Sequence, residues 1–140
     1  MKNLIFDLKE FIKIHKPEKI LHFSTEINNS KVSLNIPINK KIAKLPINGS
    51  YSFFNLEKDK YSLKHINEII SELEFFLKQN SIKSLSINFP PDIFSRSVKL
   101  FIYIMNARGW LIEEINLSSV IILDKFYKER FSRNCKRNIK

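Results

Sequence analysis

The stretch SLKHINEIISELEFFLKQNSIKSLSINF, from Ser62 to Phe89, decides the fold class because it places a long helix directly before a strand. In its first part, apolar residues recur three and four positions apart, which is the pattern of one buried helix face. We expect this helix over about residues 63–79, with Ser62 as its N-terminal cap and Asn80 in a left-handed closing position. Residues 82–89 then alternate as a strand. The apolar helix face consists of Ile66, Ile69, Ile70, Leu73, Phe76 and Leu77.

The segments before this unit contain one helical pattern and several strand patterns. The Asn28-Asn29-Ser30 turn joins two of the expected strands into a hairpin, and Asn48-Gly49 is a second turn dipeptide. Pro46 places its strand towards an edge of the sheet, because proline cannot donate to a ladder. The expected elements are a helix at residues 3–15 and strands at 19–26, 32–38, 42–47 and 51–56.

After the central unit we expect a helix opened by Ser95 and closed by Gly109, strands at 110–115 and 118–123, and a last helix from Lys125 to the end. Helices that alternate with strands in the middle of the chain indicate layers of helix and sheet, while the early hairpins indicate antiparallel pairs. The expected fold class is therefore α/β (α+β): a mixed, mostly antiparallel sheet flanked by helices. The 140 residues suit a single domain.

Composition excludes several classes of site. The chain has only two glycines, so it contains neither a GxGxxG fingerprint nor a Walker-type phosphate loop. Its single cysteine, Cys135, excludes an intramolecular disulfide and a cysteine-cluster metal site. No apolar run approaches the roughly 18 residues that a membrane span needs. Asp7 interrupts the apolar start that a secretion signal requires, so we expect a cytoplasmic setting.

The formal net charge of +10 is distributed unevenly. Residues 1–124 have a net charge of +4, whereas residues 125–140 carry seven basic residues and one acid. The chain is rich in Lys, Ile, Asn and Phe, whose codons are rich in A and T, so nucleotide bias is one explanation of the general basicity. Nucleotide bias explains the charge of residues 125–140 poorly. A bias towards A and T favours Lys codons over Arg codons, yet three of the five arginines lie there. Such a charge indicates an anionic partner: a nucleic acid, an acidic substrate or a membrane surface.

The tail is also amphipathic. Tyr127, Phe131, Cys135 and Ile139 recur every four residues, so Cys135 is more simply a buried member of this stripe than a reactive thiol. The basic remainder is the candidate substrate- or anion-binding site, because guanidinium groups bind phosphate and carboxylate bidentately. A solvated helix face whose stripe docks on a domain is the alternative. The candidate residues are Arg130, Arg133, Lys136 and Arg137.

Other polar residues give weaker indications. Asp92 follows an expected strand and directly precedes a helix, where it is either a site residue or a helix-start residue that complements the dipole. Glu113 and Glu114 are adjacent, so a strand places them on opposite faces, which does not suit a paired acid and base. His65 and Glu68 share a helix but do not make a metal site by themselves, and we expect none. The residues provide no nucleophile triad.

Several segments together resemble the FemAB-like acyltransferases of the GNAT superfamily. The tail resembles the helix that follows a strand in that family, and Gly49-Ser50-Tyr51-Ser52-Phe53 resembles its glycine-rich strand with one glycine kept. The end of residues 82–94, Phe89-Pro90-Pro91-Asp92-Ile93-Phe94, is similar to the segment after the family's central helix. Further matches are Leu34-Asn35-Ile36-Pro37-Ile38 and Asn106-Ala107-Arg108-Gly109-Trp110. The resemblance covers residues 32–140, and the order and spacing of the motifs carry it.

The resemblance implies that residues 1–124 are a GNAT-like N-terminal domain and that 125–140 form a basic amphipathic helix leading towards a missing second half. That second GNAT-like half, in the same gene or a separate chain, is the implied partner and normally carries the donor site. No cofactor is expected on this chain alone; acyl-CoA or aminoacyl-tRNA is implied for the complete enzyme. A backbone amide at a splayed strand is implied to bind the thioester or ester carbonyl. No catalytic residue is transferred.

The resemblance therefore predicts the acceptor-side domain of an acyltransferase that transfers an acyl or aminoacyl group to an amine or sugar and is inactive alone. The alternative is a non-enzymatic nucleic-acid-binding module that uses the arginine-rich C-terminal helix. An inactive remnant is a third hypothesis. The three hypotheses differ in what the chain binds.

Overall fold

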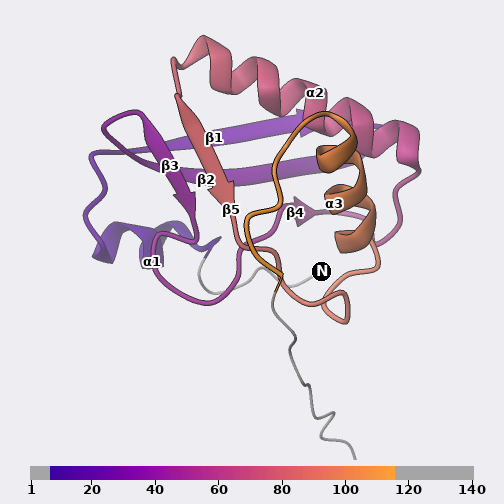
Figure 1. The fold of residues 1–140 in the computed structure, drawn as a ribbon, viewed down its shortest axis with the longest axis horizontal. Helices are drawn as coiled ribbons and strands as arrows, with labels where there is room; N and C mark the ends of the chain where they lie inside the picture. The colour runs from indigo at the N-terminus through magenta and orange to yellow at the C-terminus, as the bar shows by residue number, and fades with distance from the viewer. Residues whose placement is uncertain (1–6, 116–140) are drawn as a thin grey trace, which may run out of the picture.

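The computed structural model describes residues 7–115, which form a five-stranded mixed sheet with three helices (Figure 1). Strands β1 (Lys19–Glu26), β2 (Lys31–Asn39), β3 (Ile42–Leu45) and β5 (Ser84–Ile87) follow in the order β1-β2-β3-β5. The short strand β4 (Asn55–Leu56) pairs with β2. All pairs are antiparallel except β3 with β5, which is parallel. The expected fold class is confirmed.

The hairpin of β1 and β2 is fully paired from Lys19↔Ile38 to Glu26↔Lys31. Its tight turn lies at Asn28 and Asn29, which both adopt positive φ, a conformation that asparagine tolerates better than most residues. Ile27 and Ser30 exchange backbone hydrogen bonds across this turn. The expected hairpin, and the bounds of its first strand, are therefore confirmed.

Helix α2 (Leu63–Gln79) connects the parallel strands and has the bounds that the sequence predicts. The Ser62 side chain accepts a hydrogen bond from the backbone N–H of His65, as the capping prediction requires. The predicted role of Asn80 is wrong: Asn80 has φ −92°, and Ser81, with φ 55°, takes the left-handed position. The Asn80 side chain instead donates to the Phe76 carbonyl and so satisfies one of the last helical acceptors.

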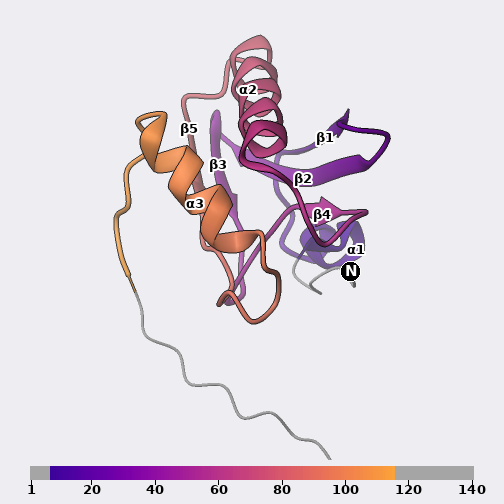
Figure 2. The same cartoon turned by 90° about the vertical axis from the view of Figure 1, so that its right-hand side faces the viewer.

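Two further helices, α1 (Lys9–Ile14) and α3 (Val98–Ala107), precede β1 and follow β5 along the chain. Helix α2 runs beside β1 and packs against α3 (Figures 1 and 2). The Ser95 hydroxyl accepts from the Ser97 backbone N–H just before α3, and Gly109 follows the helix with a φ of 94°. Gly109 therefore follows the helix as the sequence indicates, whereas α3 begins at Val98, three positions after Ser95, with Ser97 as its N-cap residue.

The hydrophobic core lies between the sheet and the two longer helices. The predicted face of α2 is buried except Phe76, which is half-buried, and Phe101 of α3 stacks on Phe54 with ring centroids 4.6 Å apart. One buried polar pair, the hydroxyls of Ser30 and Tyr61, lies 2.9 Å apart and joins the hairpin turn to the start of α2. The largest fully buried side chains include Phe54, Phe101, Ile12, Ile36, Leu45, Leu56, Ile66, Ile69, Ile70 and Leu73.

Three expected elements differ in extent or position. Helix α1 begins at Lys9, because Leu8 is extended, and residues 3–6 of the expected helix lie outside the described residues. Of residues 51–56 only Asn55–Leu56 pair as a strand, while the Ser52 N–H donates to the Asn88 carbonyl, outside any strand. The strand before Pro46 is internal, between β2 and β5. It ends at Leu45, so the missing N–H of the proline falls outside its ladder.

The expected strand at 110–115 is wrong. The indole N–H of Trp110 donates a hydrogen bond to Glu74 of α2. The following residues, up to 115, are exposed and have no strand partner in the described part of the chain. A strand requires a neighbour for its backbone groups, so the apolar pattern alone does not make one. The expected strand at 118–123, the helix at 125–140 and its candidate residues Arg130, Arg133, Lys136 and Arg137 lie outside the described residues.

Candidate functional site

The carboxyl end of the parallel pair β3–β5 is the place in this sheet where separated segments of the chain converge. The register of the pair ends at Leu45↔Ile87, and the next peptide bond, Leu45–Pro46, is cis. The Asn88 N–H donates to the Leu45 carbonyl at 2.8 Å, and the Asn88 carbonyl accepts from the Ser52 N–H at 2.8 Å. The Asn88 side chain also donates to the Ser50 carbonyl. Asn88 thus holds the 50–53 segment at the strand ends, where open sheets with parallel strands commonly bind ligands.

Asp7 brings the N-terminal segment to the same place. Its carboxylate accepts hydrogen bonds from the Ser52 hydroxyl and from the Phe53 N–H, the latter at 3.1 Å. Its backbone carbonyl accepts from the Asn35 side chain of β2 at 3.0 Å. Burial raises the pKa of Asp7 from 3.8 to about 6, partly offset by the hydrogen bonds from Ser52 and Phe53. A carboxyl group with this pKa exchanges its proton just below neutral pH, which is the property of a candidate acid or base.

Aromatic rings connect two of the sequence segments that carry the family resemblance. Tyr51 and Phe53, in the segment 49–53, pack on Phe94 and Phe89 of the segment 82–94, with ring centroids 6.4 and 5.6 Å apart. Phe53 also makes an edge contact with Phe101 of α3 at 5.2 Å. The two segments are therefore neighbours in the fold, although about 30 residues separate them in the sequence.

Asp92 lies on the loop between β5 and α3. Its carboxylate forms an exposed ion pair with Lys99 of α3 at 2.6 Å, and the hydrogen bond and charge of Lys99 lower its pKa. Asp92 therefore lies six positions before Val98, the first residue of α3, and its local partner is the Lys99 cation, so it does not begin the helix as the helix-start interpretation required. Glu113 and Glu114 lie in the exposed segment after Trp110 and belong to no strand.

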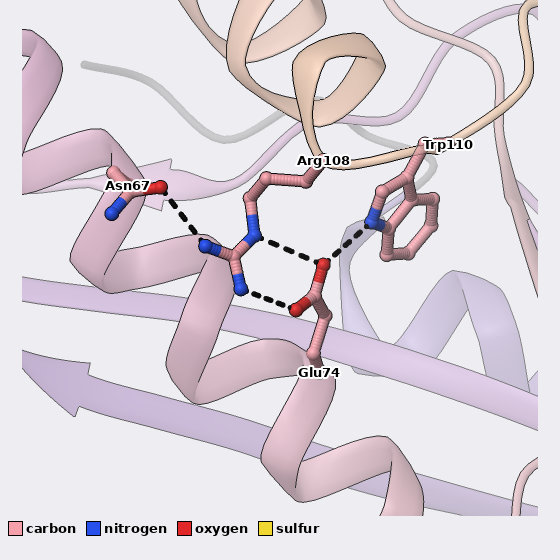
Figure 3. A network of polar contacts seen from close by, with 4 residues as sticks. All are labelled: Asn67, Glu74, Arg108 and Trp110. Carbon is pink, nitrogen blue, oxygen red and sulfur yellow. Dashed lines mark hydrogen bonds and ion pairs between the residues drawn. The ribbon is translucent and has the colours of Figure 1, made fainter.

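A second polar network holds the chain where it leaves α3 (Figure 3). Arg108 donates to both carboxylate oxygens of Glu74, from Nε at 3.1 Å and from Nη2 at 2.5 Å, and its Nη1 donates to the Asn67 side chain at 3.0 Å. The indole N–H of Trp110 donates to the same carboxylate at 3.0 Å. The hydrogen bond from Arg108 is the main cause of the lowered pKa of Glu74. The N–H donors of Arg108 and the carboxylate oxygens of Glu74 satisfy each other's hydrogen bonds. This network therefore connects α2 to the segment after α3.

Sequence reasoning did not predict these two polar groupings. Asp7, Ser52 and Asn88 are distant in sequence, and nothing local links an isolated acid to a serine 45 positions later. The second network includes Arg108 and Trp110 of the quoted motif Asn106–Trp110, but their partner Glu74 is one of three acids on α2, and no local pattern distinguishes it. Within residues 7–115, no group of three or more His, Cys, Asp or Glu side chains could hold a metal ion. Within the same range, no helix is long and apolar enough to cross a membrane.

A scan against protein-family models, a search of curated proteins and a search of solved structures found no significant match to this chain. The family resemblance consequently rests on the quoted sequence motifs alone.

Proposed function

We propose that this chain is the acceptor-side, N-terminal domain of a FemAB-like acyltransferase, in which transfer of an acyl or aminoacyl group to an amine or a sugar requires a second GNAT-like half. The observation that carries this proposal is the topology of the sheet. Three antiparallel strands, β1 to β3, are followed by a helix and a strand, β5, that is parallel to β3. This mixed, mostly antiparallel sheet with flanking helices is the architecture that the resemblance implies.

The position of the motifs supports the same proposal. The segments 49–53 and 82–94, which carry two of the matches, meet at the carboxyl end of β3 and β5 through Ser52, Asn88 and their neighbouring aromatic rings. The register of the two strands ends at Leu45 and Ile87. In the proposed enzyme, a backbone amide at this end of the parallel pair binds the carbonyl of the donor, which stabilises negative charge on its oxygen.

The donor itself belongs to the second half. Gly49 and Gly109 are 60 positions apart, so this chain has no glycine-rich loop to hold a pyrophosphate group. Residues 7–115 supply the surface at the carboxyl end of β3 and β5, where Asp7, Ser52 and Asn88 meet. The Asp7 carboxyl group, with its pKa of about 6, gains or loses a proton there near neutral pH. In this proposal that surface faces the acceptor.

A binding experiment separates this proposal from its rivals. Acetyl-CoA should leave the Tm of the 140-residue chain unchanged and should raise the Tm of a protein that also contains the second half. A clear Tm increase for the chain alone would mean that it has its own donor site, which contradicts the proposal.

The alternative function, a nucleic-acid-binding module, is favoured by the net charge of +6 in residues 125–140. A short DNA duplex is the suitable probe, because DNA is not an acyl donor and tRNA is. A module that binds through Arg130, Arg133, Lys136 and Arg137 should lose affinity steeply between 50 and 200 mM salt, roughly 10-fold for every two or three phosphates contacted. If no binding occurs at low salt, this alternative is excluded. Tight, salt-dependent duplex binding would favour it over the acyltransferase domain.

A further inference from the structure

The positive charge of the described residues is concentrated at one end of the sheet. Residues 7–115 contain 16 Lys and Arg and 12 Asp and Glu, a net charge of +4. Where β1, β3 and β5 begin, six exposed lysines and one acid, Glu18, give a local net charge of +5, so the other described residues together have a net charge of −1. We call these six lysines the lysine patch: Lys16, Lys19, Lys40, Lys41, Lys44 and Lys83.

Strand pairing brings the lysine patch together from connections that are distant in the sequence. Lys19 is the first residue of β1 and lies beside the last residues of β2, which lead into the turn of Lys40 and Lys41. The Lys83 N–H, just before β5, donates to the Lys41 carbonyl at 2.9 Å. The Glu18 carboxylate accepts from the Lys40 N–H at 2.9 Å. These segments lie on the left of Figure 1, at the end of β3 and β5 opposite the candidate site.

The side chains of the patch are available to a ligand. Within residues 7–115, the two ion pairs involve other cations, so no carboxylate neutralises these six ammonium groups at close range. Lys44 also extends the patch onto an open face of the sheet. It lies opposite Ser86 in the β3–β5 register, and Ile42 lies opposite Ser84. All four side chains are exposed and alternate with more buried ones, so they share the face away from the core.

Three lysines of the patch have a backbone conformation that lysine rarely adopts. Lys40 and Lys41 form the two-residue turn between β2 and β3 with φ values of 50° and 65°, and Lys16 has a φ of 48° just after α1. Such turns favour Asn-Gly, because a side chain crowds the backbone at positive φ. The turn between β1 and β2 meets the same requirement with Asn28 and Asn29. Lys and Asn codons differ only in the third base, so nucleotide bias does not explain the lysines, and unfavourable conformations of this kind are typical of functional positions.

The extent of the patch suits a row of phosphates rather than a single anion. Adjacent strands lie about 4.8 Å apart, so Lys19 on β1 and Lys83 beside β5, three strand positions apart, are separated by roughly 14 Å. A double helix presents about eight phosphate charges over that length. The exposed hydroxyls of Ser84 and Ser86 are further donors of the kind that contact phosphate oxygens.

Two other anionic partners fit the patch less well. A membrane surface favours several apolar side chains beside the cations, and on the exposed face of β3 and β5 only Ile42 is a large exposed apolar residue. A single strand of nucleic acid favours aromatic rings that stack on its bases. Within residues 7–115, the large exposed aromatic side chains belong to α2, α3 and the loop before α3, and none belongs to the segments of the patch: they are Phe75, Phe94 and Tyr103.

We propose that the lysine patch binds the phosphate backbone of a double-stranded nucleic acid without reading its base sequence. The lysines neutralise phosphates and release their counterions, and Ser84 and Ser86 donate to phosphate oxygens. Binding here depends neither on the proposed acyltransferase function nor on the basic residues of the alternative function, which are Arg130, Arg133, Lys136 and Arg137.

Fluorescence anisotropy of the full 140-residue chain with a labelled DNA duplex of about 20 base pairs tests the proposal. The turn variant Lys40→Asn, Lys41→Gly removes two charges and supplies the dipeptide that this turn favours, so its Tm should rise by about 2–5 °C. Its affinity at 50 mM salt should nevertheless fall at least about 10-fold, and the slope of log K against log salt should become about 2 units less negative. Two duplexes of unrelated sequence should bind within about 2-fold of each other.

The matched control is Lys60→Gln, Lys64→Gln, which removes the same charge at the start of α2. That region lies at the other end of the sheet, because the neighbouring Tyr61 hydroxyl bonds to Ser30 in the turn between β1 and β2. The control should change the affinity by less than about 3-fold. If the turn variant is less stable than the unmodified chain, Lys19→Gln, Lys83→Gln provides the same comparison outside the turn.

Four results would overturn the proposal. The first two are no duplex binding at 50 mM salt and equal affinities of the turn variant and the control. The third is loss of binding only in Arg130→Gln, Arg133→Gln, Arg137→Gln, which would assign the binding to the alternative function. The fourth is a turn variant that loses binding to phosphatidylserine vesicles but keeps duplex binding, which would assign the patch to a membrane surface. The acetyl-CoA measurement is independent of all four, so failure of this proposal and failure of the acyltransferase proposal are distinguishable.

Discussion

Arg108 binds both carboxylate oxygens of Glu74, at 3.1 Å from Nε and 2.5 Å from Nη2, and this pair joins the end of α3 to the middle of α2. Each of these side chains is 28% exposed, so the pair is partly shielded from solvent. Trp110 adds a third hydrogen bond to the same carboxylate. The contact fixes where the chain leaves α3, and therefore where the segment that follows runs relative to β5.

Glu74→Gln should destabilise the protein by about 1–2 kcal/mol, because it removes a bidentate charge-assisted interaction and leaves the Arg108 guanidinium with a weaker acceptor. Urea unfolding measures the change. Trp110 is the only tryptophan, so its fluorescence reports the same contact directly. Glu72→Gln, on the exposed face of the same helix, is the control and should change stability by less than about 0.5 kcal/mol. An equal effect of the two substitutions would contradict the structural role of Glu74.

Asp7 should make the stability of the protein fall as pH rises. Its folded pKa of about 6 lies above the reference value of 3.8, so the folded state binds more protons than the unfolded state between these values. The stabilising effect of the protonated form is complete below about pH 3.8 and is lost as the pH rises through about 6. The full difference is on the order of 3 kcal/mol. Urea unfolding between pH 3.5 and 7.5 measures it.

Asp7→Asn should flatten this pH dependence, because asparagine stays neutral and keeps one acceptor oxygen for Ser52 or Phe53. Asp92→Asn is the matched control: Asp92 is exposed and its pKa is lowered by Lys99, so its removal should leave the slope between pH 4 and 6 in place. A slope that survives in Asp7→Asn would mean that another group causes it.

Phe101→Ala should cost about 3–5 kcal/mol, because the ring is fully buried and contacts both Phe53 and Phe54. Phe75→Ala should cost far less, since the Phe75 side chain on α2 is 58% exposed. Thermal and urea unfolding of both variants give the comparison. Similar losses in the two variants would show that the ring cluster of Phe53, Phe54 and Phe101 is not the centre of the core.

Tyr61→Phe should cost about 1–3 kcal/mol, because it leaves the buried hydroxyl of Ser30 without its partner. Tyr103→Phe removes the same hydroxyl from a side chain that is 63% exposed and should be nearly neutral. The double variant with Ser30→Ala should recover part of the loss, since neither hydroxyl then remains unpaired. Failure of this recovery in a double-mutant cycle would mean that the two hydroxyls act independently.

Local patterns in the sequence were sufficient for the long elements. The apolar face of α2 and the Ser62 cap predicted that helix to its terminal residues, because both signals are contained within the helix itself. The turn at Asn28 and Asn29 likewise predicted the hairpin of β1 and β2. The internal position of β3 was missed, because it depends on β5, which reaches β3 only after the crossover through α2.

The candidate site was harder to predict for the same reason. Asp7, Ser52 and Asn88 meet only when the N-terminal segment, the loop after β3 and the end of β5 are folded together. The segment 110–115 shows the opposite failure: its apolar residues match a strand pattern, but pairing depends on a neighbour that a sequence pattern does not supply. The basic residues at 130–137 were prominent in the sequence, and they lie outside residues 7–115.

The claim that this chain is one half of a two-half acyltransferase is tested most directly by sequencing the coding DNA immediately downstream of the Lys140 codon, together with the adjacent genes. This DNA should encode a second GNAT-like half with a glycine-rich loop for the donor pyrophosphate. A stop codon after Lys140 with no such half in the neighbouring genes would contradict it.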